Sequence, residues 1–457
     1  MPTQINSENI LGTDEIKRLI FKLAIPGIVA QIINILYNIV DKIYVGHLEG
    51  TQGLALAGLG ICAPLILLIA GFSMFVCGGA APIAAIFLGE GKKEKSEEVL
   101  GVSVFLLLCF SVLITVLSFI FQDALLRIFG ANGAIFPYAK AYFGIYLFGT
   151  LFVQLALGLN TFIAAQGKAK TAMASISIGA VTNIILDPIF IFTFEMGVAG
   201  AAVATIISQA LSAAFVVFVL ISERSAIRLK FKNIKFNIRY TEKILALGVS
   251  PFIMQATESA ITLVFNRQLL IYGSELYIAA FAIMQSLMQL IVIPISGFTS
   301  GVQPIMSYNY GAKKQKRVTD TVKYSLLITL SIAVIYNIFV ALFPGIFAAL
   351  FTEEENLIHL VEKHLVIFML GMWVFPIQMV TQTFLVGTNQ PKLSLFIALL
   401  RKVLILIPLT LILPIYFGVN GIFYAEPIAD ITSITISAIV LFNSVNKLHK
   451  NSYRENL

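Results

Sequence analysis

The sequence predicts an all-α integral membrane protein with twelve transmembrane helices in two six-helix bundles related by a parallel internal repeat. Of its 457 residues, 58% are hydrophobic and 12% are charged, whereas soluble domains carry about 25% charged residues. Apolar runs recur along the whole chain and are long enough to cross about 30 Å of hydrocarbon at about 1.5 Å per residue. A sequence repeat between the two halves predicts the arrangement into bundles.

The apolar runs predict each helix in turn, and runs of well over about 20 residues indicate tilted helices. Charged residues at 14–18 stand directly before the first full-length run, so we expect no cleaved signal peptide. The predicted spans are residues 19–44, 54–86, 98–121, 136–164, 172–193, 198–222, 244–272, 277–308, 319–343, 357–386, 393–415 and 421–443.

Basic residues predict the orientation of the chain. Most of the 31 Lys and Arg residues lie in the N-terminal segment, in every second loop and after the last span, whereas the opposite loops contain only Arg127. The positive-inside rule therefore places both termini of this multi-pass protein of the cell membrane in the cytoplasm. Such flanking charges also explain the net charge of +7 through contacts with anionic lipid. We expect a monomer in the lipid bilayer, with no nucleic-acid partner.

The two halves of the chain repeat each other. The stretch GGAAPIAAIFLGEGKKEK at 78–95 aligns with SGVQPIMSYNYGAKKQKR at 300–317, and weaker matches follow in the same order. Six crossings return the chain to its starting side, so the repeat predicts parallel halves with a transport site between them. We expect an N-terminal bundle over 1–222, a basic cytoplasmic linker over 223–243 and a C-terminal bundle over 244–457.

Several stretches together carry a family resemblance that covers nearly the whole chain. They are LAIPGIVAQIINILYNIVDKIYVG, NTFIAAQGKAK, NIILDPIFIF and GVNGIFYAEPIAD. The sequence resembles the multidrug and toxic compound extrusion (MATE) family, and within it the DinF-like and MepA-like branches. The resemblance implies a V-shaped fold and a secondary active antiporter that exports amphipathic, often cationic organic compounds or other drugs. It implies protons or sodium ions as the coupling ion, no cofactor and no enzymatic activity.

Two carboxylates stand out because they interrupt apolar helices in the first half alone. Asp41 aligns with Asn266 in the second half, and Asp187 aligns with Leu409. Counted along their helices, both acids lie in the outer half of the membrane. When two carboxyl groups are close and partly desolvated, both cannot readily ionise, so we expect one of them to take up a proton. A solvated helix end is the alternative interpretation of Asp41.

The resemblance implies roles for several further residues of the first half. Pro26 would bend the first helix, although a simple packing kink is the alternative. Tyr37 and Asn183 each lie one helical turn before an acid. The implied proton- or cation-coupling residues are Tyr37, Asp41, Asn160, Asn183, Asp187 and Thr205.

The second half carries its own polar residues in apolar surroundings. We expect a structural ion pair of Arg401 with Glu426 and Asp430, because an uncompensated charge in a bundle is costly. Glu258 resembles an acid that another branch of the family pairs with a second acid in the tenth helix. Residues 365–386 contain no Asp or Glu, so this cation pair is in doubt here. A possible cation or substrate site in this half comprises Glu258, Met284, Gln285 and Met288.

Two alternatives to an antiporter remain open. A flippase for lipid-linked precursors would share the fold but should line its cavity with cationic residues for pyrophosphate. A polytopic membrane enzyme would need clustered nucleophiles or metal ligands, and the sequence contains no GxSxG, HExxH or GxxxxGK[ST] motif. We therefore expect no catalytic residues and no metal site.

Overall fold

The computed structural model describes residues 10–48 and 53–455, and every regular element in those ranges is helical. The first half comprises α1 (Ile10–Thr13), α2 (Ile16–Gly46), α3 (Leu54–Gly89), α4 (Lys93–Ile120), α5 (Gln122–Ile128), η1 (Gly133–Ile135), α6 (Phe136–Phe148), α7 (Thr150–Ala165), α8 (Ala169–Pro188), η2 (Ile189–Thr193) and α9 (Gly197–Ile221). The second half comprises η3 (Phe231–Asn233), α10 (Ile238–Tyr272), α11 (Glu275–Gly311), α12 (Gln315–Leu342), α13 (Pro344–Ala349), α14 (Glu355–Phe368), η4 (Leu370–Trp373), α15 (Phe375–Gly387), α16 (Pro391–Leu399), η5 (Leu400–Leu406), α17 (Ile407–Phe417) and α18 (Val419–Glu455).

The predicted all-α membrane fold is confirmed. Within the described ranges, ten helices are long and apolar enough to cross a membrane without a break, and an eleventh span consists of α6 and α7 with a bend of 60° between them. The segment from α14 to α15, interrupted by η4, completes the predicted twelve. Several helices extend beyond their apolar runs, as α10 does by starting at Ile238, because polar residues continue a helix once it has left the hydrocarbon.

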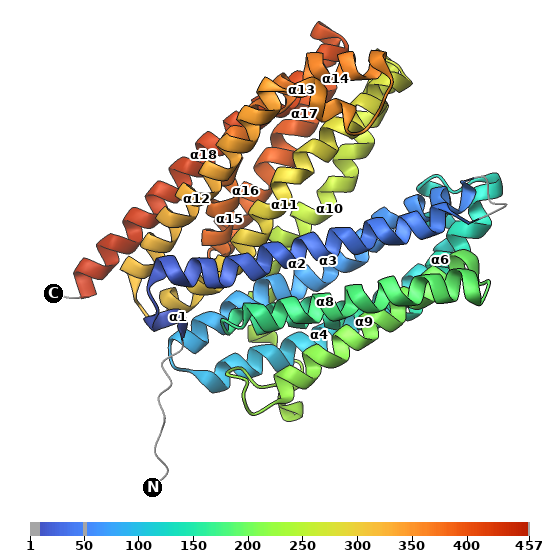
Figure 1. Cartoon of the computed structure of the whole chain (residues 1–457). Helices are drawn as coiled ribbons and strands as arrows, with labels where there is room; N and C mark the ends of the chain where they lie inside the picture. The colour runs from blue at the N-terminus through green and yellow to red at the C-terminus, as the bar shows by residue number, and fades with distance from the viewer. Residues whose placement is uncertain (1–9, 49–52, 456–457) are drawn as a thin grey trace.

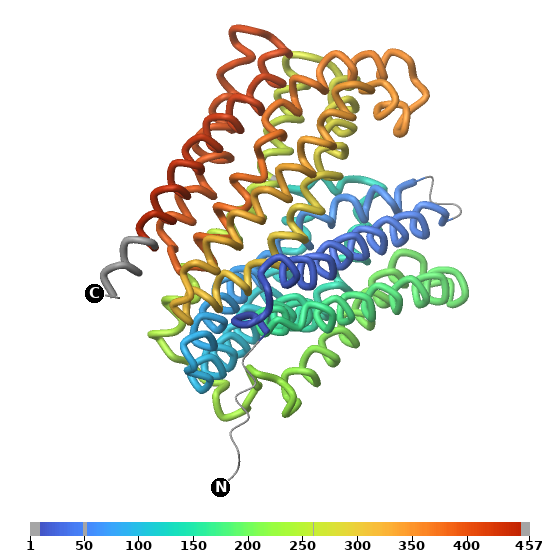
Figure 2. Tube along the Cα trace, turned by 60° about the vertical axis from the view of Figure 1, so that its left-hand side comes forward, coloured from blue at the N-terminus to red at the C-terminus, as the bar shows by residue number. Residues whose placement is uncertain are grey.

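The helices form two groups, with α2–α9 in one and α10–α18 in the other (Figure 1). The groups pack together through α3 against α10 and α2 against α11, as well as α3 against α11. They adjoin at the end of the molecule that holds α1 and diverge toward the opposite end, where α6 and α14 lie (Figures 1 and 2).

Glycines allow the two groups to touch backbone to backbone. A Cβ on Gly89 of α3 would collide with the carbonyl oxygen of Tyr308, and a Cβ on Gly311 of α11 would collide with that of Ile86. The repeat pairs Gly89 with Gly311 and Ile86 with Tyr308, so the crossing of α3 and α11 is two-fold symmetric. Small residues are the usual means of close helix packing in membranes.

The short helix α1 is fastened to the second group at this end. Asn309 Nδ2 and Arg317 donate to the carbonyl of Leu11 at 2.8 and 3.1 Å. Lys314 Nζ donates to the carbonyl of Gly12 at 2.9 Å, and Arg317 donates to that of Asp14 at 2.8 Å. The start of the first half is thus held by the end of α11, the start of α12 and the loop between them.

The segment between the two groups is held in turn by the first group. Gln166 Oε1, after α7, accepts hydrogen bonds from the Ser225 hydroxyl at 2.8 Å and the Ile227 amide at 3.1 Å. The backbone of Asn233 lies so close to Gly101 of α4 that a side chain there would collide with it. The connecting segment therefore follows the surface of the first group before α10 begins.

Replacing Gly89 by Val tests the backbone contact between α3 and α11. We expect the added side chain to force the two helices apart and to destabilise the protein by about 1–3 kcal/mol, the usual cost of overpacking. Thermal unfolding of the purified protein measures the loss. Gly60→Val is the matched control, because it lies on the same helix and a Cβ there meets nothing within 4 Å. Equal melting temperatures for the two variants would contradict the prediction.

Candidate functional site

A polar cavity of about 110 Å³ lies inside the first group, between α2, α7, α8 and α9. Small residues provide the space, since Ala30, Ala156, Gly179 and Ala180 all face it. Its polar side chains are those of Gln31, Asn34, Tyr37, Asn183, Thr205, Ser208, Gln209 and Ser212. Polar groups that converge on a pocket within an apolar bundle are typical of a binding site.

The polar lining follows from helical spacing. Thr205, Ser208, Gln209 and Ser212 recur at intervals of three and four residues, which places them on one face of α9. The sequence analysis included Thr205 and missed the other three. This stripe of hydroxyl and amide residues in an apolar helix is the signal that could have identified them.

Asp41 of α2 and Asp187 of α8 lie one helical turn beyond the lining residues Tyr37 and Asn183. Both acids are buried, and they are near enough for their charges to interact. Asn183 Nδ2 donates to Asp187 Oδ1 at 3.0 Å. Asp187 Oδ2 and Asp41 Oδ1 are buried and have no hydrogen-bond partner in the described part of the chain. A bare buried carboxylate is costly, so these oxygens are suited to bind a proton or a cation.

Tyrosine side chains complete the surroundings of the acids. Tyr37 interacts electrostatically with both Asp41 and Asp187. Tyr142 of α6, which the sequence analysis did not single out, is buried and lies near Asp41 and Thr205. Four helices, α2, α6, α8 and α9, therefore contribute to this group. Tyr138, Tyr142 and Tyr146 recur every four residues along α6, and this spacing marks one face of the helix without showing which tyrosine lies near the acids.

The backbone beside Asp187 departs from regular α-helix. Pro188 lacks an N–H group, and the five residues after it, Ile189–Thr193, form a π-helical turn. π-helical turns inside helices are frequent at functional sites. The irregularity thus coincides with the acid rather than with a loop.

Two further predicted residues belong to helices that form the cavity but do not line it. Asn160 of α7 is half-buried, and its Oδ1 has no hydrogen-bond partner among the described residues. Pro26 is buried within α2, and its neighbour Gly27 lies against the carbonyl of Gly297 on α11. The predicted bending residue therefore lies where α2 contacts the second group.

The second group contains a buried cluster of charged side chains. Arg401 donates to Glu426 Oε1 at 2.7 Å and also to Asp430. Lys402 forms an ion pair with Glu258 and donates to the carbonyl of Met254 at 3.0 Å. A cavity of about 30 Å³ adjoins the cluster. In contrast to Asp41 and Asp187 of the first group, for which no ion pair is found among the described residues, each acid of this cluster has a basic partner.

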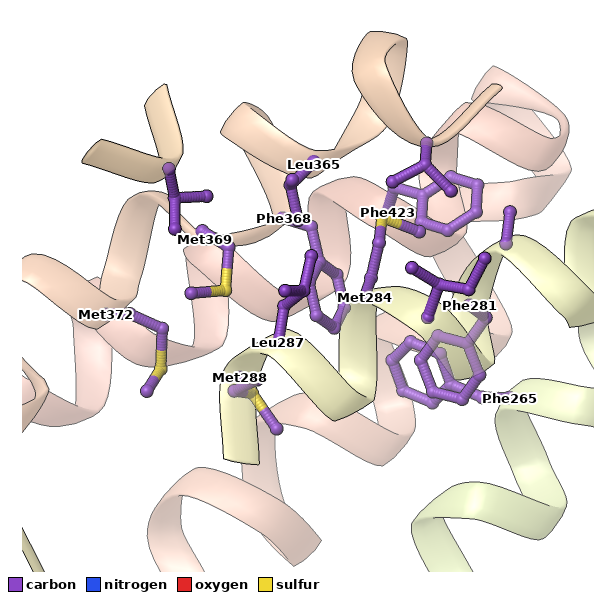
Figure 3. Packing of buried hydrophobic residues seen from close by; sticks show 14 of the residues in the cluster. Phe265, Phe281, Met284, Leu287, Met288, Leu365, Phe368, Met369, Met372 and Phe423 are labelled. Atoms are coloured by element: carbon purple, nitrogen blue, oxygen red, sulfur yellow. The ribbon is translucent and has the colours of Figure 1, made fainter. Parts of the chain in front are cut away.

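The predicted residues of α11 lie in two different surroundings. Gln285 and Met288 line the small cavity beside Glu258. Met284 is fully buried in the hydrophobic core, where its side chain lies among those of Phe281, Phe368 and Phe423 (Figure 3). Met284 is therefore part of the packing of α11 against α14 and α18 and is not among the cavity-lining residues. No group of three or more His, Cys, Asp or Glu side chains suited to a metal ion occurs in the described ranges.

Comparisons with known proteins agree with this architecture. The family model described as MatE matches the chain twice, over residues 26–189 and 251–412, once in each half. The multidrug export protein MepA of Staphylococcus haemolyticus is 26% identical over 429 residues, covering 93% of each chain. MepA of Staphylococcus aureus is 25% identical and covers 92% of each chain.

Solved structures share the fold. A crystal structure of MATE in the bent conformation superposes with a TM-score of 0.91, covering 97% of this chain and 98% of that chain at 24% identity. An outward-facing multidrug resistance MATE family transporter of the MOP superfamily has a TM-score of 0.88, with 96% and 98% coverage at 24% identity.

Replacing Asn183 by Leu tests the contact with Asp187. Asn183 is the one donor to Asp187 in the described part of the chain, so its loss leaves both carboxylate oxygens unsatisfied. We expect a destabilisation of about 1–3 kcal/mol, measured by thermal unfolding. The same substitution made in an Asp187→Leu background is the control, because two apolar side chains leave no unsatisfied group. An equal loss in both backgrounds would show that the hydrogen bond is not the cause.

Proposed function

Because the chain belongs to the MATE family, whose members are transporters and not enzymes, we propose that it is a multidrug efflux antiporter. It exports amphipathic or cationic organic compounds in exchange for protons, with sodium ions as the alternative coupling ion. The observation that carries this proposal is the buried pair Asp41 and Asp187, which stands beside a polar cavity and has oxygens with no hydrogen-bond partner among the described residues. The multidrug export relatives from staphylococci support the substrate class.

The orientation of the proposed transporter follows from its basic residues. The positive-inside rule assigns the end that holds α1 and the loop after α11 to the cytoplasm, with both termini on that side. Since the two groups adjoin at this end and diverge at the other, this arrangement corresponds to an outward-open state (Figure 1). We propose that residues 1–222 and 244–457 act as two moving bundles joined by a linker over 223–243. The outer limits of this division fall in residues 1–9 and 456–457, outside the described residues.

Protons that enter the cell down their electrochemical gradient drive the export of the drug. When the outward-open state exposes the acids to external solution, one carboxyl of the pair takes up a proton, and the loss of charge weakens the attraction for a bound cation. The drug leaves toward the outside. After the return to the inward-open state the proton leaves to the cytoplasm, and each net charge moved across 100 mV contributes about 2.3 kcal/mol. The cycle requires only that the proton and the drug have different affinities for the two states.

Helix α2 connects the acids to the contact between the bundles. It packs against α8 of its own bundle and against α11 of the other. Asp41 lies 14 residues beyond Gly27, which is about 21 Å along the helix. A change in the bend at Pro26 would therefore alter the position of Asp41 and the contact of Gly27 with Gly297 together. Tyr37, Asn160, Asn183 and Thr205 act in this proposal as the polar surroundings of the coupling pair.

Asp41→Asn and Asp187→Asn are each expected to abolish active efflux of ethidium. Each variant keeps the size of the side chain and removes the proton-binding carboxyl group, so the drug can no longer be exchanged for a proton. Efflux from energised cells that express equal amounts of each variant measures the effect. Asp123→Asn is the control, because Asp123 is an exposed acid paired with Lys140. Ethidium efflux at the wild-type rate in both site variants would refute the proposal.

The coupling ion is tested in proteoliposomes that contain a pH-reporting dye. Addition of ethidium to the wild-type protein is expected to release protons at equal rates in sodium chloride and choline chloride. The Asp41→Asn/Asp187→Asn double variant should release none. Proton release that is absent, with ethidium movement that depends on sodium, would assign the coupling to sodium instead.

A further inference from the structure

The ammonium group of Lys402 contacts oxygen atoms of the kinds that bind monovalent cations. It contacts the carboxylate of Glu258 and, at 3.0 Å, the backbone carbonyl of Met254. Carboxylate and carbonyl oxygens are the ligands that hard cations prefer. The Lys402 side chain is 7% exposed, whereas that of Glu258 is 45% exposed. The acid therefore faces an accessible space, and the lysine reaches it from inside the bundle.

The backbone explains how the lysine reaches this position. Residues Leu400–Leu406 form a π-helical segment between α16 and α17, and within it the consecutive residues Arg401 and Lys402 are both buried. Arg401 is occupied by Glu426 and Asp430. Lys402 is consequently the basic residue that remains for Glu258. Counted together, three acids face two bases, so the cluster has one acid in excess and the loss of Lys402 would raise the excess to two.

The space beside Lys402 is large enough for a small ion. The adjoining cavity has a volume of about 30 Å³, above the roughly 10–15 Å³ that one water molecule needs. Glu258, Gln285 and Gln289 line it. Glutamine side chains provide amide oxygens that accept hydrogen bonds or coordinate cations. The carbonyl of Met254, which already accepts from Lys402, adds a further oxygen ligand beside the cavity.

We propose that Lys402 is a tethered cation that occupies a monovalent-cation site of the second bundle, formed by Glu258, the Met254 carbonyl and the side chains of Gln285 and Gln289. In the natural protein the ammonium fills the site, so this bundle needs no ion from solution. Removal of the ammonium converts it into a site for a free ion, and Na⁺ is the ion of suitable size and charge. The consequence that ion exchange falls to the first bundle rests on the proposed antiport, whereas the site itself does not.

The test replaces Lys402 by Met, which keeps the apolar stem and removes the charge. Melting temperatures of the purified proteins are compared in sodium chloride and in choline chloride of equal ionic strength. We expect the wild type to show equal values, and Lys402→Met to show a rise of several degrees that saturates with sodium. The Glu258→Gln/Lys402→Met double variant is the matched control and should lose the sodium effect. This measurement needs no transport, so it can fail while the proposed antiport stands.

A plain structural ion pair would give a different result. In that case Lys402→Met would lose the same stability in both salts, and this outcome overturns the proposal. Failure of the variant to fold in sodium chloride also overturns it, because sodium is expected to replace the ammonium.

A second variant, Lys402→Ala, leaves room for a freely diffusing amine. Methylammonium chloride is expected to raise its melting temperature above the value in choline chloride, whose cation is too large for the cavity. Equal melting temperatures in the two salts would count against the tethered-cation site.

Discussion

The arrangement of charged side chains in both bundles depends on the free-energy cost of placing a carboxylate inside a membrane. The second bundle meets the cost by pairing, since Arg401 contacts Glu426 and Asp430, and Lys402 contacts Glu258. The first bundle has no such base against Asp41 and Asp187, whose free oxygens lack a hydrogen-bond partner among the described residues. If these acids were purely structural, both duplicated halves would be expected to pair them with a base. The difference supports the proposal that the first pair binds and releases a ligand.

The first helix of each half is also held differently within its own bundle. In the second bundle, Gln382 of α15 donates to the hydroxyls of Ser250 and Ser394, which fastens α10 beside Pro251. Ser250 corresponds to Ile25 in the first bundle, Ser394 to Ala172 and Gln382 to Asn160, whose Oδ1 is unpaired in the described structure. The polar fastening next to the proline is therefore absent from α2. Of the two corresponding prolines, Pro26 lies in the helix that is less restrained and that also carries an acid.

The sequence predicts correctly the features that depend on composition and on the order of residues along the chain. Hydropathy located the helices, and the aligned glycines Gly89 and Gly311 are among those that meet the opposite backbones. It did not predict the 60° bend between α6 and α7 or the interruption at Leu370–Trp373, because hydropathy alone does not show where the backbone departs from a regular helix. Gly149 stands at the first break, and Gly371 and Pro376 stand at the second. The π-helical turns were missed for the same reason. Tyr142 could not be assigned from the sequence, since its role depends on which helix α6 faces.

The positions of the acids and of the bundle contact explain why only one side of the membrane should reach the pair in this state. The backbone contacts at Gly89 and Gly311 and the hydrogen bonds that hold α1 lie at one end of the bundles. Asp41 lies five residues before the last residue of α2, at the opposite end. In the proposed orientation, a proton from the cytoplasm would have to pass the closed crossing of α3 and α11, whereas a proton from the other side meets the diverging helices. Because α2 takes part in both the acid pair and the contact with α11, closing one end and exposing the other are coupled through a single helix.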